Sequence, residues 1–446
     1  MRLRSFLVGS ILTLSYVGAS VSAQDALPPS EASPDNSYFA PPRPTAKPAV
    51  GDSEVSFSLS EMATGEMATL GGGPSCDGDA VCEDDLCCGG GGFCETVSIV
   101  EGLSLKNFLG MRCCDRWEVG GWTQIGYHNN NQPLSQAYND LLSFNDLPDN
   151  ANLHQQWFYL GRVADAECGW DWGARADIIY GTDGQKTQAF GNPDAGVRGF
   201  GSFDASMDHG IYGWAIPQLY GEVAYNDLSV KIGHFFTIIG YEVVPSPGNF
   251  FYSRSYTMFN SEPFTHTGAL ATYSGYEDLT LYGGWVLGWD TGFDQLNSGN
   301  AFLGGITAQC TDDVSLAYAT CYGNFGWRDG GSNDSYCHSI VLSWNINDCW
   351  TYVAQSDLVS TTNDGVSEFD TIGLNNYLFY KWTERISIGG RHEWWKADGV
   401  SFNAVTGGMN IRVCDNLIFR PEIRQDWAPG IGLDESTAGV DMVLTY

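Results

Sequence analysis

Apolar and polar residues alternate with a period of two through this chain from Trp117 to its last residue, Tyr446. In the final run, one face carries only large apolar side chains, and these are Val440, Met442, Leu444 and Tyr446. Alternation of this length is the signature of a β-strand. A strand that is apolar on one face and ends on an aromatic ring is typical of a transmembrane β-barrel, because lipid contacts that face and the ring suits the membrane–water boundary.

Sixteen such runs follow one another, and most have the roughly 9–11 residues that a tilted strand needs to cross a bilayer. The runs are 117–127, 153–164, 170–180, 215–225, 228–238, 267–276, 279–289, 301–309, 314–323, 337–346, 349–359, 369–380, 385–396, 401–413, 417–427 and 438–446.

The connections between these runs alternate in length. Short ones, such as 226–227 and 347–348, are Asn/Asp pairs that favour tight hairpins. Long ones lie between them, at 128–152, 181–214, 239–266, 290–300, 324–336, 360–368 and 428–437, and only 397–400 breaks the order. Outer-membrane barrels have short periplasmic turns and long external loops. We therefore predict an all-β fold, an antiparallel transmembrane β-barrel of about 16 strands over residues 116–446.

The N-terminus reads as a signal peptide over residues 1–23, with a basic start, an apolar core from Phe6 to Tyr16 and a small-residue cleavage site at 21–23. An N-terminal membrane anchor is the alternative. The next residue is Gln24 and not Cys, which disfavours a lipoprotein. Residues 24–74 are rich in Pro, Ser and Ala and predict a flexible tether. Residues 75–115 form a Cys-rich periplasmic segment, in which 103–109 suggests a helical turn or two.

Composition narrows the class of protein. Charged residues make up 17% of the chain and aromatic residues 13%, with 55 glycines. Average charged usage is about 25%, so the chain suits closely packed β-structure. The net charge of −32 excludes a nucleic-acid partner, because phosphates need a basic surface. It fits acidic loops that face water.

Thirteen cysteines in an exported chain predict disulfides. Cys321 ends one run and Cys337 begins the next, both on the inner face, so we predict a disulfide that clasps the loop between them. The cluster from Cys76 to Cys114 lacks two spaced Cys-x-x-Cys pairs, which favours disulfides over a metal. Its pairing stays open, and we assign no metal.

The long loop 239–266 has too many aromatic residues for a solvated loop. We predict that it folds into the barrel and narrows the channel, with Glu242 and Glu262 facing charges on the wall; an ordinary external loop is the alternative. Arginine is costly on a lipid face, so basic residues of the strands should line a polar lumen. The predicted pore-lining residues are Arg162, Arg175, Lys231, Glu242, Glu262, Arg391, Arg412, Arg420, Glu422 and Arg424. Simple pairing with neighbouring carboxylates is the alternative.

No motif for catalysis is visible among Gly-x-Ser-x-Gly, His-Glu-x-x-His and phosphate-loop patterns. The two residues His338 and Ser339 point to opposite faces of a strand and cannot act together. We therefore predict no enzyme activity, no catalytic residues and no cofactor.

Several short stretches resemble one family of proteins: 121–127, 219–222, 231–235, 251–256 and 266–268. From residue 121 to 446 the chain is similar to the OmpL-like β-barrel porins, which are common in planctomycete-type bacteria. The resemblance implies an outer-membrane channel and carries no substrate. We predict passive diffusion of small hydrophilic solutes or ions, with outer-membrane lipid as a partner. A homotrimer and a monomer both stay open, because a lipid-facing surface and a subunit interface are both apolar. The alternatives are an outer-membrane barrel enzyme of lipase or protease type, and a secreted adhesin or sugar-binding β-protein.

Overall fold

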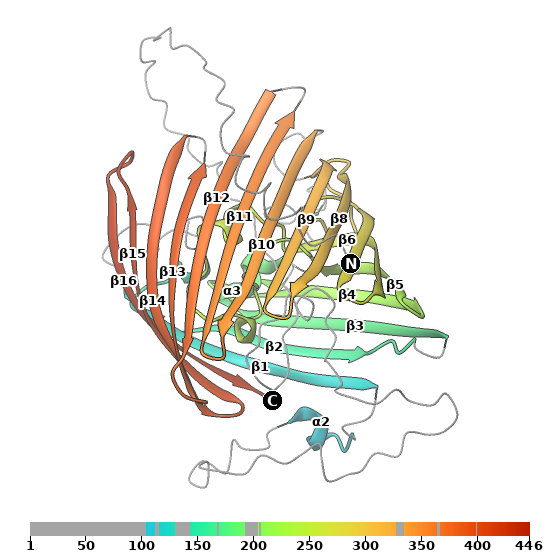
Figure 1. Ribbon diagram of the computed structural model, residues 1–446, viewed down its shortest axis with the longest axis horizontal. Coiled ribbons are helices and arrows are strands. Elements are labelled where there is room, and N and C mark those ends of the chain that lie inside the picture. The colour runs from blue at the N-terminus through green and yellow to red at the C-terminus, as the bar shows by residue number, and fades with distance from the viewer. Residues whose placement is uncertain are drawn as a thin grey trace. The chain divides into compact units, whose positions relative to one another are not determined.

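The computed structural model describes residues 104–111, 116–129, 143–166, 169–191, 204, 207–326, 334–363, 366–397 and 399–446. The predicted signal peptide and tether, and most of the predicted Cys-rich segment, lie outside these residues. The described strands form one closed antiparallel barrel in which each strand pairs with its neighbours in sequence and the first strand pairs with the last (Figure 1).

The barrel has sixteen strands, as the sequence predicts. They are β1 Trp117–His128, β2 Asn152–Arg162, β3 Trp170–Gly181, β4 Gly213–Tyr225, β5 Leu228–Phe236, β6 Thr265–Tyr276, β7 Leu279–Val286, β8 Asn300–Thr311, β9 Val314–Asn324, β10 Ser335–Asn347, β11 Trp350–Asn363, β12 Val366–Lys381, β13 Ile386–Ala397, β14 Val400–Cys414, β15 Leu417–Ala428 and β16 Leu433–Thr445.

The terminal residue completes the closure of the barrel. Tyr446 exchanges two backbone hydrogen bonds with Gly121, of 2.9 and 3.0 Å, beyond the last pair that joins β1 to β16. Its ring lies 5.8 Å from the ring of Phe158 on the outer face of β2. Val440 is exposed, whereas Asp441 and Val443 are buried. The face of the last strand that carries Val440 therefore points outward, as the alternation predicts. The closed ring also leaves no unpaired strand edge.

Two external loops are shorter than predicted. The connection expected at 360–368 is mostly strand, and only 364–365 separates β11 from β12. The one expected at 428–437 shrinks to 429–432, since β16 begins at Leu433. In both hairpins, backbone pairing between the strands continues beyond the apolar band. The side chains there do not contact lipid, so they need not alternate and the sequence pattern does not show them as strand. Strict alternation of loop length was therefore wrong at these two places.

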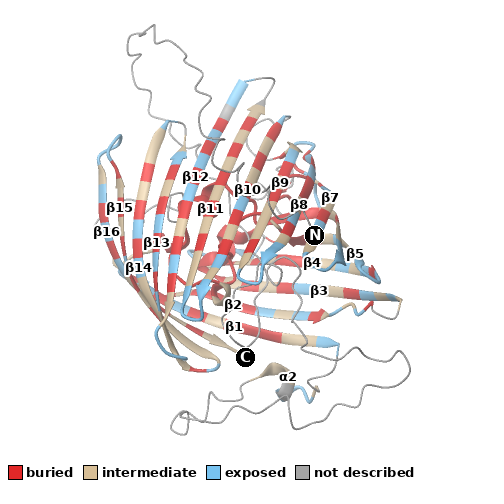
Figure 2. Cartoon of the chain, in the orientation of Figure 1, coloured by how far each residue is buried: buried red, intermediate tan, exposed pale blue. Residues whose placement is uncertain are grey.

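Successive residues of each strand point alternately to the lipid-facing surface and to the packed interior. Figure 2 shows this as alternating bands of burial along β10 to β13. Outer positions carry exposed apolar side chains such as Leu160, Ile232 and Trp285. Inner positions are polar or packed. This pattern is that of a transmembrane barrel.

Short helices lie in the connections and before β1. They are α2 Leu105–Phe108, η3 Ser143–Asn145, α3 Thr182–Thr187, η6 Ser246–Gly248 and α4 Tyr256–Asn260. The first of these agrees with the helical turn predicted at 103–109. Within the described residues, no helix is long and apolar enough to cross a membrane.

Candidate channel constriction

The connection between β5 and β6, residues 237–264, lies inside the barrel and is here called the inner loop. It contains η6 and α4, and all its residues are buried except 238, 247 and 248, which are half-buried. In a ring of sixteen strands, β13 and β14 stand opposite β5 and β6. The inner loop bonds to β13 and β15, so it crosses the lumen to the far wall.

Two arginines of β15 hold the backbone carbonyls of the inner loop. Arg420 donates hydrogen bonds of 2.7 Å to the carbonyl oxygens of Ser246 and Asn249. Two inward positions further along the strand, Arg424 donates to the carbonyl oxygen of Arg254 at 3.0 Å. Because hydrogen bonds to a charged donor are roughly twice as strong as neutral ones, both contacts fix the loop against the wall.

Two carboxylates of β15 hold donors of the same stretch. The backbone N–H groups of Tyr252 and Ser253 donate to Glu422, at 2.9 and 3.1 Å. The hydroxyl of Tyr256 donates to Asp426. The inward face of β15 thus alternates in charge, and each cation meets a loop carbonyl while each anion meets a loop donor. The loop segment 246–256 runs parallel to β15 along this ladder.

Strand β13 adds a second anchor beside the first. Arg391 forms ion pairs with Glu242 of the loop at 2.6 Å and with its strand neighbour Glu393 at 2.7 Å. Glu393 also accepts from Arg424 at 2.8 Å and from the backbone N–H of Tyr256 at 2.8 Å. Arg391 is 1% exposed and Glu393 0%. Buried charges need such complete pairing, because desolvation of an unpaired ion costs several kcal/mol.

An arginine within the inner loop holds the loop's own shape. Arg254 donates to the carbonyl oxygens of Val243 at 2.9 Å, Val244 at 3.1 Å and Tyr252 at 3.0 Å. Burial, together with the nearby Arg420, lowers the pKa of Arg254 to about 10. The guanidinium therefore stays charged at neutral pH, and it ties the two arms of the loop together.

The near side of the loop is fixed to β2. Gln155 donates to the carbonyl oxygen of Val244 at 2.7 Å and accepts from the N–H of Ser246 at 3.0 Å. The hydroxyl of Tyr252 lies 2.6 Å from Nε2 of His154.

The returning arm of the loop contacts β11 and β13. Gln355 of β11 donates to Glu262 at 2.6 Å. The indole N–H of Trp395 on β13 donates to the hydroxyl of Ser261 at 2.8 Å. Together with the contacts on β15 and β2, these bonds attach the loop to most of one half of the barrel wall.

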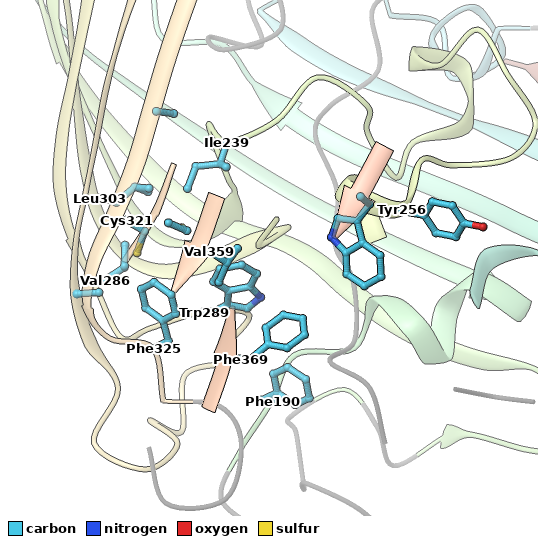
Figure 3. Packing of buried hydrophobic residues seen from close by; sticks show 14 of the residues in the cluster. Phe190, Ile239, Tyr256, Val286, Trp289, Leu303, Cys321, Phe325, Val359 and Phe369 are labelled. Carbon is cyan, nitrogen blue, oxygen red and sulfur yellow. The ribbon is translucent and has the colours of Figure 1, made fainter. Parts of the chain in front are cut away.

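Apolar packing fills the spaces between these polar contacts. The rings of Tyr241 and Tyr377 lie 4.8 Å apart, and those of Phe250 and Phe379 lie 4.7 Å apart. A further cluster contains Ile239 and Tyr256 of the loop together with residues of the β6 to β9 wall; Figure 3 shows part of it. The inner loop is therefore packed like a protein core and not like a solvated loop.

Other connections support the inner loop from the external side. Lys186 of α3 forms an ion pair with Asp146, at 2.7 Å. Asp290, in the connection after β7, accepts from the N–H groups of Phe264 and Thr265 at 2.8 and 3.1 Å. The N–H of Phe190 donates to the carbonyl of Asp290 at 2.6 Å. Three external connections therefore contact one another or the end of the inner loop.

Five of the predicted pore-lining residues converge on the ladder just described, and they are Glu242, Arg391, Arg420, Glu422 and Arg424. They are buried, and the three arginines are 1–2% exposed. All three arginines are paired with carboxylates, which is the alternative that the sequence left open. Glu262 lies apart from them, against Gln355.

Three other predicted residues face inward away from the ladder. Arg175 lies 3.9 Å above the ring of Tyr159 and is paired with Asp177. Lys231 stands opposite Glu222 in the β4–β5 register. Arg412 is half-buried near the periplasmic end of β14.

Arg162 is placed on the outer face, in contrast to its predicted place in the lumen. Its register partners, Trp117 and Ala174, belong to that face. The guanidinium lies 4.3 Å from the ring of Trp172 and pairs with Asp171 at 3.0 Å. Arg162 ends its strand at the periplasmic rim, where a long side chain can reach the boundary water.

Several contributors to the site were absent from the predicted set. Glu393 and Asp426 were not in that set, although the alternation of β13 and β15 places each of them on the inner face, two residues from a predicted arginine. Asp441 pairs with Arg420, and its inward position is readable from the alternation of β16. Nothing in the sequence around Gln155 marks it, and Ser253 is marked only by its place in the stretch 251–256 that carries the family resemblance.

Cys321 and Cys337 are direct register partners on β9 and β10. Both are buried on the inner face, and both are free thiols in the structure; Figure 3 places Cys321 beside Leu303. The positions suit the predicted cross-strand disulfide, which stays a prediction.

Comparisons with known proteins place this barrel in a family. The model of "Putative beta-barrel porin-2, OmpL-like" matches residues 116–443. Among solved structures, an anion-selective porin from Comamonas acidovorans is 9% identical with a TM-score of 0.52, covering 74% of this chain and 99% of that one. The outer-membrane channel DcaP of Acinetobacter baumannii is 8% identical with a TM-score of 0.49, covering 74% and 97%.

A triple mutant of the Rhodopseudomonas blastica porin is 15% identical with a TM-score of 0.48, covering 74% and 100%. None of the curated proteins compared with the chain matches it. The match over most of the sequence, together with the closed barrel, shows that the chain belongs to the OmpL-like porin-2 family and is an outer-membrane channel.

Proposed function

We propose that this channel passes small hydrophilic solutes by passive diffusion and that the inner loop sets its narrowest cross-section. The observation that carries the proposal is the attachment of the loop to the wall opposite its own strands, through Arg391, Glu422 and their neighbours. A segment fixed at both sides of a lumen restricts the free area around it. Size exclusion follows from this position.

The buried arginines act in this proposal as anchors of the inner loop and not as an anion filter. A filter must present its charge to the passing ion. Arg391 and Arg424 are each 1% exposed, and they donate hydrogen bonds to carboxylates and to loop carbonyls. The chain carries a net charge of −32. We therefore expect a mild preference for cations, unlike the anion-selective porin named above.

This role needs no chemical step, so we propose a channel without enzyme activity. In the part of the chain that the structure describes, no group of three His, Cys, Asp or Glu side chains is placed to hold a metal. The apolar outer face suits contact with lipid or with another copy of the chain, and a homotrimer is the assembly we propose.

Single-channel recording in planar bilayers tests the proposal. Purified barrels should give discrete conductance steps. In a salt gradient, the sign of the reversal potential should show that cations pass more readily than anions. Salt screens exposed charges within about 10 Å at 0.1 M, so the preference should fall as salt rises. Protein that migrates as a folded, heat-modifiable barrel and yet gives no steps would refute the channel. Material that washes off intact membranes would favour an adhesin.

A further inference from the structure

Polar side chains on the outer face of the barrel are grouped so that they satisfy one another. Thr123 donates to Gln156 at 2.9 Å, and Gln156 donates to the hydroxyl of Tyr446. On the other side of the barrel, the Tyr336 hydroxyl lies 3.1 Å from that of Tyr318 and 3.0 Å from Nδ1 of His338. Such grouping is expected, since hydrocarbon offers no hydrogen bonds and unsatisfied polar groups are costly there.

His392 departs from this pattern. It is exposed on the outer face of β13, with Gly390 and Trp394 at the neighbouring outward positions. Its register partner Asn376 lies between the exposed side chains of Leu374 and Leu378, so the pair is within the apolar band. Among the described residues, the imidazole of His392 has no hydrogen-bond partner, whereas Asn376 accepts from Tyr352 at 2.6 Å.

Bare backbone adjoins His392. Gly390 and Gly407 are direct partners across β13 and β14. A Cβ added at Gly407 would meet nothing within 4 Å, and one added at Gly390 would meet only a backbone oxygen at 4.0 Å. A second outward glycine pair, Gly283 and Gly304, differs because the ring of Phe302 lies against Gly304. The first pair, here called the glycine hollow, is left uncovered by its own chain.

A large apolar side chain stands beside the glycine hollow. Ile423 is the register partner of Gly407 on β15, and it is 68% exposed. Because the projecting side chain lies to one side of the bare patch, Ile423 of one copy can enter the glycine hollow of the next in a head-to-tail ring. Small residues allow close approach between protein surfaces within membranes, and polar side chains there find partners across such contacts.

We propose that the outer face of β12 to β15, centred on His392 and the glycine hollow, is the contact between copies of this chain in the membrane. One copy presents Ile423 to the hollow of the next, and His392 gains polar contact across the interface. Acyl chains could cover the bare backbone but offer no partner to an imidazole, so lipid alone accounts for less of this surface. The proposal gives a location to the assembly suggested under the proposed function.

Native mass spectrometry of the full-length protein in detergent tests the interface with two matched substitutions. Gly407→Trp fills the hollow. Gly221→Trp fills an equally bare outward glycine on β4, where an added Cβ also meets nothing within 4 Å. Neither glycine has a positive φ, and aromatic residues suit strands, so both variants should fold as heat-modifiable barrels. We expect the wild type and Gly221→Trp to be oligomers and Gly407→Trp to be a monomer that still conducts.

A wild-type monomer, or an oligomer that survives in Gly407→Trp, would overturn the proposal. Loss of the oligomer only in Gly221→Trp would overturn it too and would place the contact on β4. If Gly407→Trp does not fold, His392→Leu decides the matter, because this change suits lipid. The loss of its interface contact should raise the protein concentration for half-dissociation about tenfold, and an unchanged concentration would refute the interface. Conductance is read separately, so a failed interface is distinguished from a failed channel.

Discussion

Replacing Arg391 by methionine should release the inner loop from the far wall. The guanidinium pairs with Glu242 and Glu393 and donates to the carbonyl of Ser253 at 2.9 Å. Methionine fills similar space but leaves both carboxylates buried without this cation. Breaking a buried ion pair by removing one partner costs about 3–5 kcal/mol. That energy corresponds to a shift of roughly a hundredfold to several thousandfold from the attached toward the detached loop.

Two measurements report on this shift. Hydrogen exchange followed by mass spectrometry should show faster exchange of four loop amides, whose N–H groups donate to Glu422, Glu242 and Glu393 in the attached loop. They are the amides of Tyr252, Ser253, Ser255 and Tyr256. Single-channel recordings should show a larger or noisier conductance, since a detached loop no longer restricts the lumen in one position. The barrel itself should stay folded, because the strand ladder does not depend on this side chain.

The control is Arg412→Met on β14, which also removes an inward-facing arginine but lies at the periplasmic end of its strand. It should leave exchange in the loop unchanged. Arg391→Lys should be intermediate, because lysine keeps the charge but loses the planar fork that reaches two carboxylates. If Arg391→Met left both exchange and conductance at the wild-type values, the view that buried ion pairs hold the inner loop would be refuted.

Three further expectations follow from the fold. Peptide mapping of protein purified under oxidising conditions should find Cys321 joined to Cys337, and recovery of both as free thiols would refute the disulfide. Truncation after Ala428 removes β16 and should abolish stable membrane insertion, because β1 and β15 are left as open edges; heat-modifiable, conducting barrels from this truncation would contradict the closure. The reversal potential should have the cation sign at low salt and approach zero near 1 M, where the Debye length is about 3 Å; an anion sign at low salt would refute the assignment of the arginines as anchors.

The strands could be read from the sequence because the membrane imposes their pattern. Contact with lipid favours an apolar side chain at every second position, so alternation alone was enough to predict β3 and β10. Strand ends outside the apolar band carry no such demand. The hairpin of β11 and β12 therefore extends to Asn363 and Val366 through residues that read as a loop.

The site was predictable in position but less so in its pairing. Parity along β13 and β15 places Arg391 and Arg424 on the inner face, and the aromatic content of the inner loop indicates that it packs inside. Which carboxylate meets which guanidinium depends on the depth at which the loop runs. Alternation within a strand contains no information on that depth. Arg162 was misplaced for a related reason, since parity alone does not mark the rim, where an outward arginine is tolerated.

The β15 ladder offers a physical account of why the inner loop is ordered without regular secondary structure over most of its length. A buried loop must satisfy its backbone N–H and C=O groups, and a strand would do so by pairing its own backbone. The backbone of β15 is already bonded to β14 and β16, so only its side chains are free to serve the loop. Arg420 and Arg424 supply donors for loop carbonyls, and Glu422 supplies an acceptor for loop N–H groups. Exchanging Glu422 with Arg424 would keep the net charge of the strand and present each loop group with the wrong partner, so this double variant should detach the loop as fully as Arg391→Met. If the exchanged strand held the loop as well as the original, net charge rather than the order of donors and acceptors would be what orders the loop.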